Sequence, residues 1–178
     1  MKRPHRKITL SELVEYVDSR DRPLGIMPLS EVHRQSLFHR SVLVLVYNPS
    51  GKVFLQKRAA SKSVYPGRYD VSASGHVQAG ESRLEAAIRE LDEELGIAVD
   101  TLRVIGNAPA SPMTGFEFVT LYTAGKTPAA PRPNPEEVAD GLFVDRAELA
   151  YMADRFRELL TPGLVHFFEQ NAIFPRGR

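Results

Sequence analysis

The chain has 178 residues, of which 43% are apolar and 25% are charged, and it contains no cysteine. These proportions are typical of a globular protein that is long enough to bury a hydrophobic core. The lack of cysteine excludes disulfides, thiolate zinc sites and a cysteine nucleophile. The formal net charge of +1 offers no bulk attraction to nucleic acid or to an anionic membrane, so we expect no nucleic-acid polymer as a partner.

Two further features bear on where the protein is found. The N-terminal segment MKRPHRKITL is basic, but no apolar stretch follows it, which argues against a secretory signal peptide. The longest strongly apolar run, VLVLVY at residues 42–47, is too short to span a bilayer. We therefore expect a cytoplasmic protein without a membrane-spanning segment.

Residues 1–36 are predicted to form an N-terminal extension. Residues 12–18 and 22–29 are typical of two strands around the turn SRDR, and residues 30–37 of a short helix that Ser30 caps. The apolar character of this hairpin has two explanations that the sequence leaves open. The hairpin either packs on the body of the same chain or forms the interface of a homodimer.

A second hairpin is predicted from SVLVLVY (41–47), the turn NPSG and KVFLQKR (52–58). Its first strand is apolar enough to be buried on both faces. A polar segment with a Pro-Gly break follows at residues 59–70.

The strongest helix prediction covers Ser82 to Gly96. Apolar residues recur in it at spacings of three and four, which gives one apolar stripe along a helix: Leu84, Ile88, Leu91 and Leu95. Gly96 is the residue type that ends helices in the left-handed conformation.

The remaining elements mix strands and helices without a regular alternation, which favours an α+β fold. They are predicted as strands at 102–106 and 116–123, a proline-rich loop at 124–141, a short strand LFV (142–144), a helix at 145–160 that begins with a capping box of Asp145 and Glu148, and a final apolar helix at 163–174 that packs back on the body.

The segment RELDEELG (89–96) lies within the long helix and concentrates carboxylates. At about 100° per residue, Glu90, Glu93 and Glu94 share one face, whereas Asp92 points away from them. One interpretation is a solvated charged face. The other is a binding site for a divalent cation, which would relieve the repulsion between the glutamates. Oxygen ligands of this kind suit Mg²⁺ or Mn²⁺.

A longer motif favours the cation site. Residues 75–97, GHVQAGESRLEAAIRELDEELGI, resemble the signature of the Nudix hydrolase family. The fixed positions of that signature are matched without insertion by Gly75, Glu81, Arg89, Glu90, Leu91, Glu93, Glu94, Gly96 and Ile97.

The resemblance implies an α/β/α sandwich with a central mixed sheet, here with an N-terminal β-hairpin extension. It implies one domain over residues 1–178, with a core at 37–160 and a C-terminal helix and tail at 161–178. Family members use Mg²⁺ or Mn²⁺ to hydrolyse nucleoside diphosphates that are linked to another group. The expected partner is therefore a small-molecule diphosphate.

The same resemblance implies roles for individual residues. By position, Glu90, Glu93 and Glu94 would hold the metal, and Glu81 and Arg89 would orient the helix and its ligands. A general base must take the proton of the attacking water. Within the signature Glu93 or Glu94 is the candidate. A later loop offers Glu136 or Glu137 instead, and we favour Glu137.

Upstream of the signature, residues 37–76 are similar to isopentenyl-diphosphate isomerases, a branch of the same family. By position, Arg58 and Lys62 match bases that grip the diphosphate there, and Gly75 and His76 are assigned to the same substrate-binding set. His39 and His76 match histidine metal ligands of the isomerases, and His33 lies near the place of a third.

The resemblance to the isomerases fails at one position. Ser74 stands where they carry a catalytic cysteine, so we expect hydrolysis rather than isomerisation. A non-catalytic binding module is a third hypothesis, against which the complete set of signature glutamates argues. Substrate specificity is expected from loops 59–70, 107–115 and 124–141, with Met113, Phe116 and Glu117 as candidate contacts.

Overall fold

A mixed sheet of seven strands lies at the centre of the structure, a computed structural model that describes residues 12–174. Its strands are β3 (His39–Tyr47), β4 (Val53–Arg58), β5 (Tyr69–Asp70), β6 (Ala73–His76), β7 (Arg103–Ala108), β8 (Glu117–Lys126) and β9 (Val138–Val144). The main path runs in the order β5-β4-β3-β8-β7, while β6 also pairs with β3 and β9 with β4. Only the pairing of β3 with β8 is parallel among these strands, so the sheet is mixed, as predicted.

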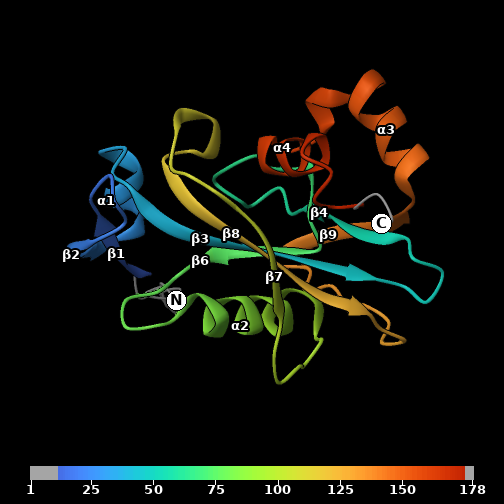
Figure 1. Cartoon of the computed structure of the whole chain (residues 1–178), viewed down its shortest axis with the longest axis horizontal. Helices are drawn as coiled ribbons and strands as arrows, with labels where there is room; N and C mark the ends of the chain where they lie inside the picture. Colours follow the sequence, from blue (N-terminus) through green and yellow to red (C-terminus); the bar gives the residue numbers. More distant parts are fainter. Residues whose placement is uncertain (1–11, 175–178) are drawn as a thin grey trace, which may run out of the picture.

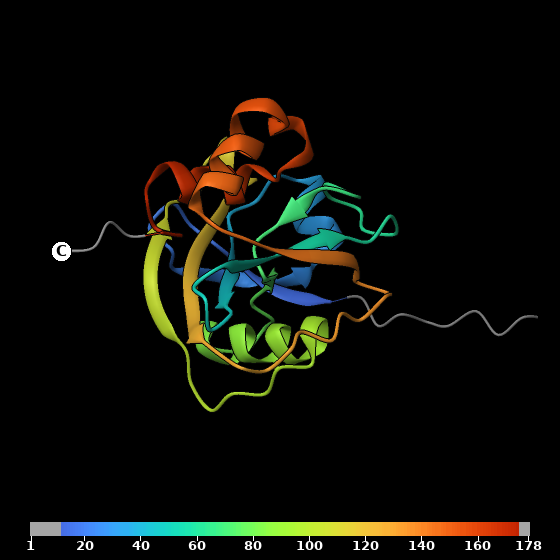
Figure 2. The same ribbon diagram turned by 90° about the vertical axis from the view of Figure 1, so that its right-hand side faces the viewer.

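Helices cover the sheet on both faces. Helix α2 (Arg83–Leu95) lies on one face, and α3 (Arg146–Arg155) and α4 (Pro162–Glu169) lie on the other (Figures 1 and 2). This is the three-layered α+β arrangement that the sequence predicts.

The central strand β3 explains why two helical layers are needed. Its residues Leu43 and Leu45 are buried in the cluster that includes α3 and α4, whereas Val42 and Val44 are buried in the cluster under α2. Successive side chains of a strand point to opposite faces, so a strand that is apolar throughout must be covered on both. The prediction for this run is confirmed.

The predicted hairpin of β3 and β4 forms only at its closed end. The two strands pair at Tyr47 and Val53 and then diverge, because β3 takes β6 as its antiparallel neighbour and β4 takes β9. At the point of divergence, buried Ser72 accepts a hydrogen bond from the Val46 N–H at 2.8 Å and donates one to the Phe54 carbonyl at 2.6 Å. One side chain thus satisfies backbone groups that lack a ladder partner.

Helix α2 begins and ends as predicted. The Ser82 hydroxyl accepts the Glu85 N–H at 3.2 Å, and the Glu85 carboxylate accepts the Ser82 N–H at 2.8 Å, which completes a capping box. Gly96 closes the helix in the left-handed region with a φ of 61°.

The N-terminal extension forms a separate two-stranded sheet of β1 (Leu13–Val17) and β2 (Pro23–Pro28), followed by α1 (Leu29–Arg34), at one end of the molecule (Figure 1). The prediction that Ser30 caps this helix is wrong. Pro28 occupies the capping position, no side chain caps the helix, and Ser30 lies within it. The proline ring fixes φ, here at -58°, just before the first turn, and α1 starts at Leu29, two residues earlier than a Ser30 cap would place it.

The hairpin contacts the body of the chain. The Val17 N–H donates to the Phe38 carbonyl at 2.8 Å, and the Ala79 N–H donates to the Leu13 carbonyl at 2.9 Å. The homodimer remains a prediction.

The C-terminal third departs from the predicted boundaries. Strand β8 extends to Lys126 and β9 starts at Val138, so the proline-rich loop is shorter than predicted. Helix α3 has the predicted capping box but ends at Arg155, and a 3-10 turn follows at Arg157–Leu159. Helix α4 buries Leu164 and other apolar residues in the core, as expected for a helix that packs on the body.

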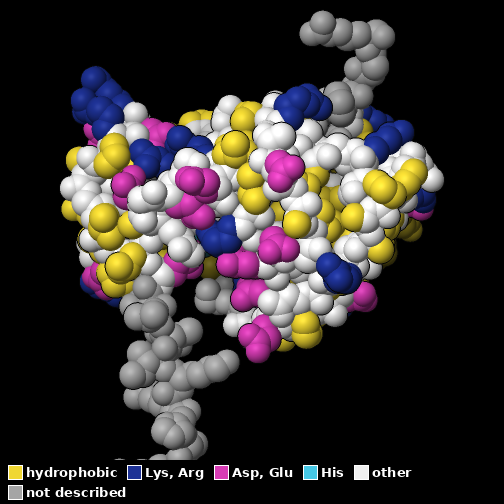
Figure 3. Space-filling view, turned by 90° about the horizontal axis from the view of Figure 1, so that it is seen from below, with side chains coloured by type: hydrophobic (Ala, Val, Ile, Leu, Met, Phe, Trp, Pro, Cys, Tyr) yellow, Lys and Arg dark blue, Asp and Glu magenta, His cyan; other side chains and the backbone are white. Residues whose placement is uncertain are grey.

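The surface next to α2 mixes charges of both signs with apolar side chains (Figure 3). No helix within residues 12–174 is long and apolar enough to cross a membrane. The basic N-terminal segment and the last four residues, to which the predicted tail belongs, lie outside the described residues.

Candidate active site

A cavity of about 840 Å³ lies where β3, β6 and α2 meet the loops before β5, β8 and β9. Nearly all of the residues predicted for the site line it, although they come from distant parts of the sequence. These are Arg58, Lys62, Gly75, His76, Arg89, Glu90, Glu93, Glu94 and Glu137. Glu81 does not line the cavity and contacts it through Arg89. Asp92 is exposed and outside the lining, in agreement with the helical geometry.

Glu94 lies deepest, with a side chain that is 1% exposed. Its Oε2 accepts hydrogen bonds from the Gln56 amide and from the Ser74 backbone N–H, both at 2.9 Å. Its Oε1 has no hydrogen-bond partner among the described residues. Burial, reinforced by the charge of Glu90, raises the pKa of Glu94 to about 7. Burying a carboxylate oxygen without a hydrogen-bond partner is costly, and a bound cation would offset that cost.

Glu90 lies directly over Gly75. A Cβ atom at position 75 would overlap the Glu90 carboxylate, so only glycine leaves room for it. Burial raises the pKa of Glu90, and the neighbouring Arg89 opposes that effect. We predicted a substrate-binding role for Gly75. Its evident contribution in this structure is the space that it leaves for Glu90.

Arg89 ties the carboxylates together. Its Nε and Nη2 donate to Glu81 at 2.8 and 3.1 Å, and its Nη1 donates to Glu90 at 2.7 Å and to Glu93 at 3.1 Å. A further bond, at 3.1 Å, reaches the His76 carbonyl. The planar guanidinium suits such a fork, because its donors have fixed directions. Arg89 therefore connects α2 with the loop before it and with β6.

The three glutamates on one face are not equivalent. Glu93 is 57% exposed, in contrast to the buried Glu94 and the nearly buried Glu90. The helical spacing predicts the shared face correctly. The depth of each carboxylate depends on the strands that pack against the helix.

The two predicted phosphate-binding bases are paired with carboxylates. Lys62 forms an ion pair with Glu137, and its Nζ is 3.8 Å from Glu94 Oε1. Arg58 Nη1 lies 3.3 Å from the carboxylate of buried Asp70. Glu136, the alternative general base, is exposed and does not line the cavity.

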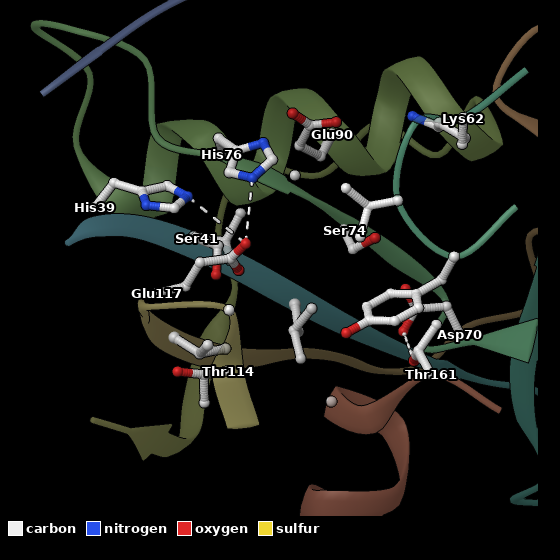
Figure 4. Close-up of a pocket in the computed structure, with 18 of the residues that line it drawn as sticks. His39, Ser41, Lys62, Asp70, Ser74, His76, Glu90, Thr114, Glu117 and Thr161 are labelled. Carbon is white, nitrogen blue, oxygen red and sulfur yellow. Dashed lines mark hydrogen bonds and ion pairs between the residues drawn. The ribbon is translucent and has the colours of Figure 1, made fainter. Parts of the chain in front are cut away.

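A second group of possible metal ligands lines the same cavity. The ligand atoms of His33, His39, His76 and Glu117 lie within 4.8 Å of one another. His39 and His76 converge on Glu117, with Nε2 atoms 3.6 and 3.4 Å from its Oε1 (Figure 4). The Nε2 of buried His39 has no hydrogen-bond partner among the described residues, so a ligand atom is free there too.

Charge coupling within this histidine cluster is strong. Burial by itself would raise the pKa of Glu117, but the adjacent His39 and His76 hold it well below its usual range. Burial also opposes the charged form of His76, yet the Glu117 carboxylate raises the pKa of this imidazole. His33 shows the opposite result, because burial and the other two histidines lower its pKa. The cluster therefore combines an anionic carboxylate with two imidazoles, those of His33 and His76, whose pKa values shift in opposite directions.

Several residues of the site escaped the sequence reasoning. Gln56 and Asp70 belong to no sequence motif, and their roles depend on strands that pair only in the folded chain. Glu117 was expected to contact substrate rather than to join the histidines. Thr161 was also missed. It caps α4 and donates to Asp70 at 2.7 Å, which joins the C-terminal helix to the cavity wall (Figure 4).

A model of the NUDIX domain matches residues 37–163 of the chain. This chain belongs to the Nudix family. An uncharacterised Nudix hydrolase of Pseudomonas aeruginosa is 38% identical over 146 residues, which cover 82% of this chain and 85% of that relative. This Nudix chain also resembles an isopentenyl-diphosphate Delta-isomerase of Nocardia farcinica, with 34% identity over 164 residues, which cover 88% of this chain and 92% of the relative.

The fold has a close counterpart among solved structures. The crystal structure of DR0079 from Deinococcus radiodurans superposes with a TM-score of 0.77 at 27% identity, and covers 89% of this chain and 98% of that one. The Nudix fold that the signature implies is therefore confirmed, as is the likeness to the isomerase branch. The family and the relatives named as Nudix hydrolases support a pyrophosphohydrolase, an enzyme that acts on acid anhydrides.

Proposed function

We propose that this Nudix protein hydrolyses the diphosphate linkage of a nucleoside diphosphate derivative or a similar small molecule, with Mg²⁺ or Mn²⁺ held by Glu90, Glu93 and Glu94. One observation carries the proposal. Glu94 is buried beside Glu90, and its Oε1 faces the cavity without a hydrogen-bond partner among the described residues. A divalent cation would satisfy that oxygen and offset the repulsion between the two carboxylates.

The donor set fits a hard cation, because it consists of carboxylate oxygens. When bound, the cation would offset negative charge on the phosphoryl oxygens and would make bound water a better nucleophile. Arg89 holds two of the carboxylates at 2.7 and 3.1 Å and is itself held by Glu81. We assign these two residues the task of fixing the ligands before the substrate arrives.

Glu137 is our candidate for the general base. It lines the cavity on the loop before β9, and its backbone carbonyl accepts the Ala59 N–H at 2.9 Å, so the loop is tied to the core. A base must reach the proton that it removes, and a half-buried carboxylate in the cavity lining can do so. Its partner Lys62 would have to move away first.

Arg58 and Lys62 are our candidates for binding the diphosphate. Both line the cavity, and a guanidinium and an ammonium complement phosphate oxygens. The rest of the substrate would meet the loops that carry Tyr65, Met113 and Phe116, which also line the cavity. We propose that these side chains contribute to specificity.

The test is a phosphate-release screen over nucleoside diphosphates and triphosphates, dinucleoside polyphosphates, sugar-nucleotides and coenzyme A, with Mg²⁺ or Mn²⁺. We expect turnover that EDTA abolishes and that Glu94→Gln removes. Asp92→Asn, which makes the same chemical change outside the cavity, should retain activity. Near-normal rates in Glu94→Gln would refute the proposed metal site.

The histidine cluster suggests a second cation site. Three imidazoles and one carboxylate converge, and one buried imidazole nitrogen lacks a hydrogen-bond partner among the described residues. Imidazole ligands favour transition metals over Mg²⁺, so Mn²⁺ and Zn²⁺ are better candidates here. The test is to measure the metal content of the purified wild-type protein and of the purified His39→Gln variant.

Isoprenoid diphosphate isomerisation is the second candidate function. The histidine cluster and the relatives named as isomerases favour it. Ser74 at the place of the cysteine counts against it, since a serine hydroxyl is a far weaker acid than a thiol. An isomer-exchange assay decides between the two. Exchange without diphosphate hydrolysis would overturn the hydrolase proposal.

A further inference from the structure

Lys62 brings a positive charge into the carboxylate site. Its Nζ is 3.8 Å from Glu94 Oε1 and forms an ion pair with Glu137 Oε2. Glu94 is 1% exposed, and this Oε1 accepts no hydrogen bond from any residue in the described range. The ammonium is therefore the group that balances the buried carboxylate charge on this side of the cavity.

Backbone contacts hold Lys62 in that place. The Ala59 N–H donates to the Glu137 carbonyl at 2.9 Å, and the Ser61 hydroxyl donates to the Glu136 carbonyl at 3.2 Å. The Lys62 N–H donates to the Ala59 carbonyl at 3.2 Å, which closes a turn. Because the loop before β5 is attached to the loop before β9, the pair is built into the fold rather than left to one long side chain.

A divalent cation and this ammonium cannot occupy the same space. A Mg²⁺ or Mn²⁺ ion bound to Glu94 Oε1 would lie about 2 Å from that oxygen. Lys62 Nζ lies 3.8 Å from the same oxygen, so the two positive charges would lie within about 6 Å of each other and would repel one another. We infer that Lys62 is the internal counter-ion of the carboxylate site, and that a divalent cation displaces its ammonium from Glu94 and Glu137.

The displacement has a consequence for substrate binding. While Lys62 is paired with two carboxylates, its donors are committed to them. Once displaced, the ammonium has three donors for phosphate oxygens at the mouth of the same cavity. Cation binding would therefore precede diphosphate binding and strengthen it. This step rests on the proposed function, since it takes the substrate to be a diphosphate.

The first test measures the affinity of the metal-free protein for Mn²⁺ by electron paramagnetic resonance, without substrate. We expect Lys62→Met to bind Mn²⁺ about tenfold more tightly than wild type, because a competing charge is gone; tenfold is about 1.4 kcal/mol. Lys62→Arg keeps the charge and should bind like wild type. Lys57→Met is the matched control, because Lys57 lies near the Tyr69 ring and outside the cavity lining.

An unchanged or weaker Mn²⁺ affinity in Lys62→Met would overturn the inference. The histidine cluster is a second candidate Mn²⁺ site, so any change in Mn²⁺ affinity must be assigned to one of the two sites. In a Glu94→Gln background, Lys62→Met should bring no further gain, because the competition takes place at Glu94. A gain that persists in that background would place the effect elsewhere and would also overturn the inference.

A measurement on the wild-type chain does not depend on whether the variants fold. An ion-paired amine is acylated more slowly than a free one, so saturating Mn²⁺ should raise the rate of Lys62 acylation severalfold, as measured by mass spectrometry. Lys57 should not change. A Lys62 rate that stays constant or falls would contradict the displacement.

These results separate the inference from the proposed function. Metal-dependent hydrolysis together with an unchanged Lys62→Met affinity would overturn the exchange and leave the function intact. A tighter Lys62→Met site in a protein that cleaves no diphosphate would support the exchange and refute the function.

Discussion

Replacing Glu94 by glutamine should make the metal-free protein more stable while it abolishes hydrolysis. The side chain is 1% exposed and has a pKa of about 7, against 4.5 for an ordinary glutamate. The folded protein therefore binds this proton more tightly than the unfolded chain does. The corresponding contribution to stability is fully present below pH 4.5 and is lost as the pH rises to about 7.

The magnitude follows from the same two pKa values. At about 1.4 kcal/mol for each pH unit, the gap between about 7 and 4.5 corresponds to roughly 3 kcal/mol. Glutamine keeps the shape and the acceptor oxygen that Gln56 and the Ser74 N–H contact, but it carries no charge. At pH 8 we expect Glu94→Gln to exceed wild type by about 1–3 kcal/mol in free energy of unfolding, and at pH 4.5 we expect little difference.

The assay is urea denaturation in EDTA at pH 4.5, 6 and 8, followed by circular dichroism. Asp92→Asn is the control, because it removes one carboxylate from an exposed position of the same helix. Its stability should follow that of wild type at each pH. If Glu94→Gln is no more stable than wild type at pH 8, the buried carboxylate carries no desolvation penalty and our account of the site is wrong.

Three further variants test other parts of the structure. Gly75→Ala should keep the fold but lower the hydrolysis rate at least tenfold, because its Cβ would displace the Glu90 carboxylate; activity like that of wild type would contradict the close contact. Ser72→Ala should lower the free energy of unfolding by about 2 kcal/mol in urea titrations, because it leaves two buried backbone groups of the diverging strands without a partner. An unchanged midpoint would show that water replaces the hydroxyl. His39→Gln should remove one class of Mn²⁺ site and leave the class that depends on the glutamates; loss of both classes would show that they are not independent.

The local parts of the fold could be read from the sequence. The apolar stripe, Ser82 and Gly96 define helix α2, because helical periodicity and capping depend on residues within a few positions of one another. The same periodicity places Glu90, Glu93 and Glu94 on one face, and all three line one cavity. The continuous apolar run of β3 indicates a strand with a helical layer on each side.

The pairing of the strands could not be read in the same way. The turn after β3 predicts a full hairpin, yet β3 prefers the distant strands β6 and β8 along most of its length. Turn residues report only on the closed end of a hairpin, whereas the neighbour of each strand is decided by burial over the whole sheet. Ser72 looks like an ordinary polar residue until two diverging strands meet at its hydroxyl.

The sequence by itself determined the family, the position of helix α2 and which carboxylates share a face. Only the tertiary structure decided that Glu94 is buried, that the Lys62 ammonium lies 3.8 Å from it and that Glu117 joins three histidines. The physical reason is that residue types and spacings define local geometry, whereas desolvation and charge pairing depend on groups that are brought together from across the chain.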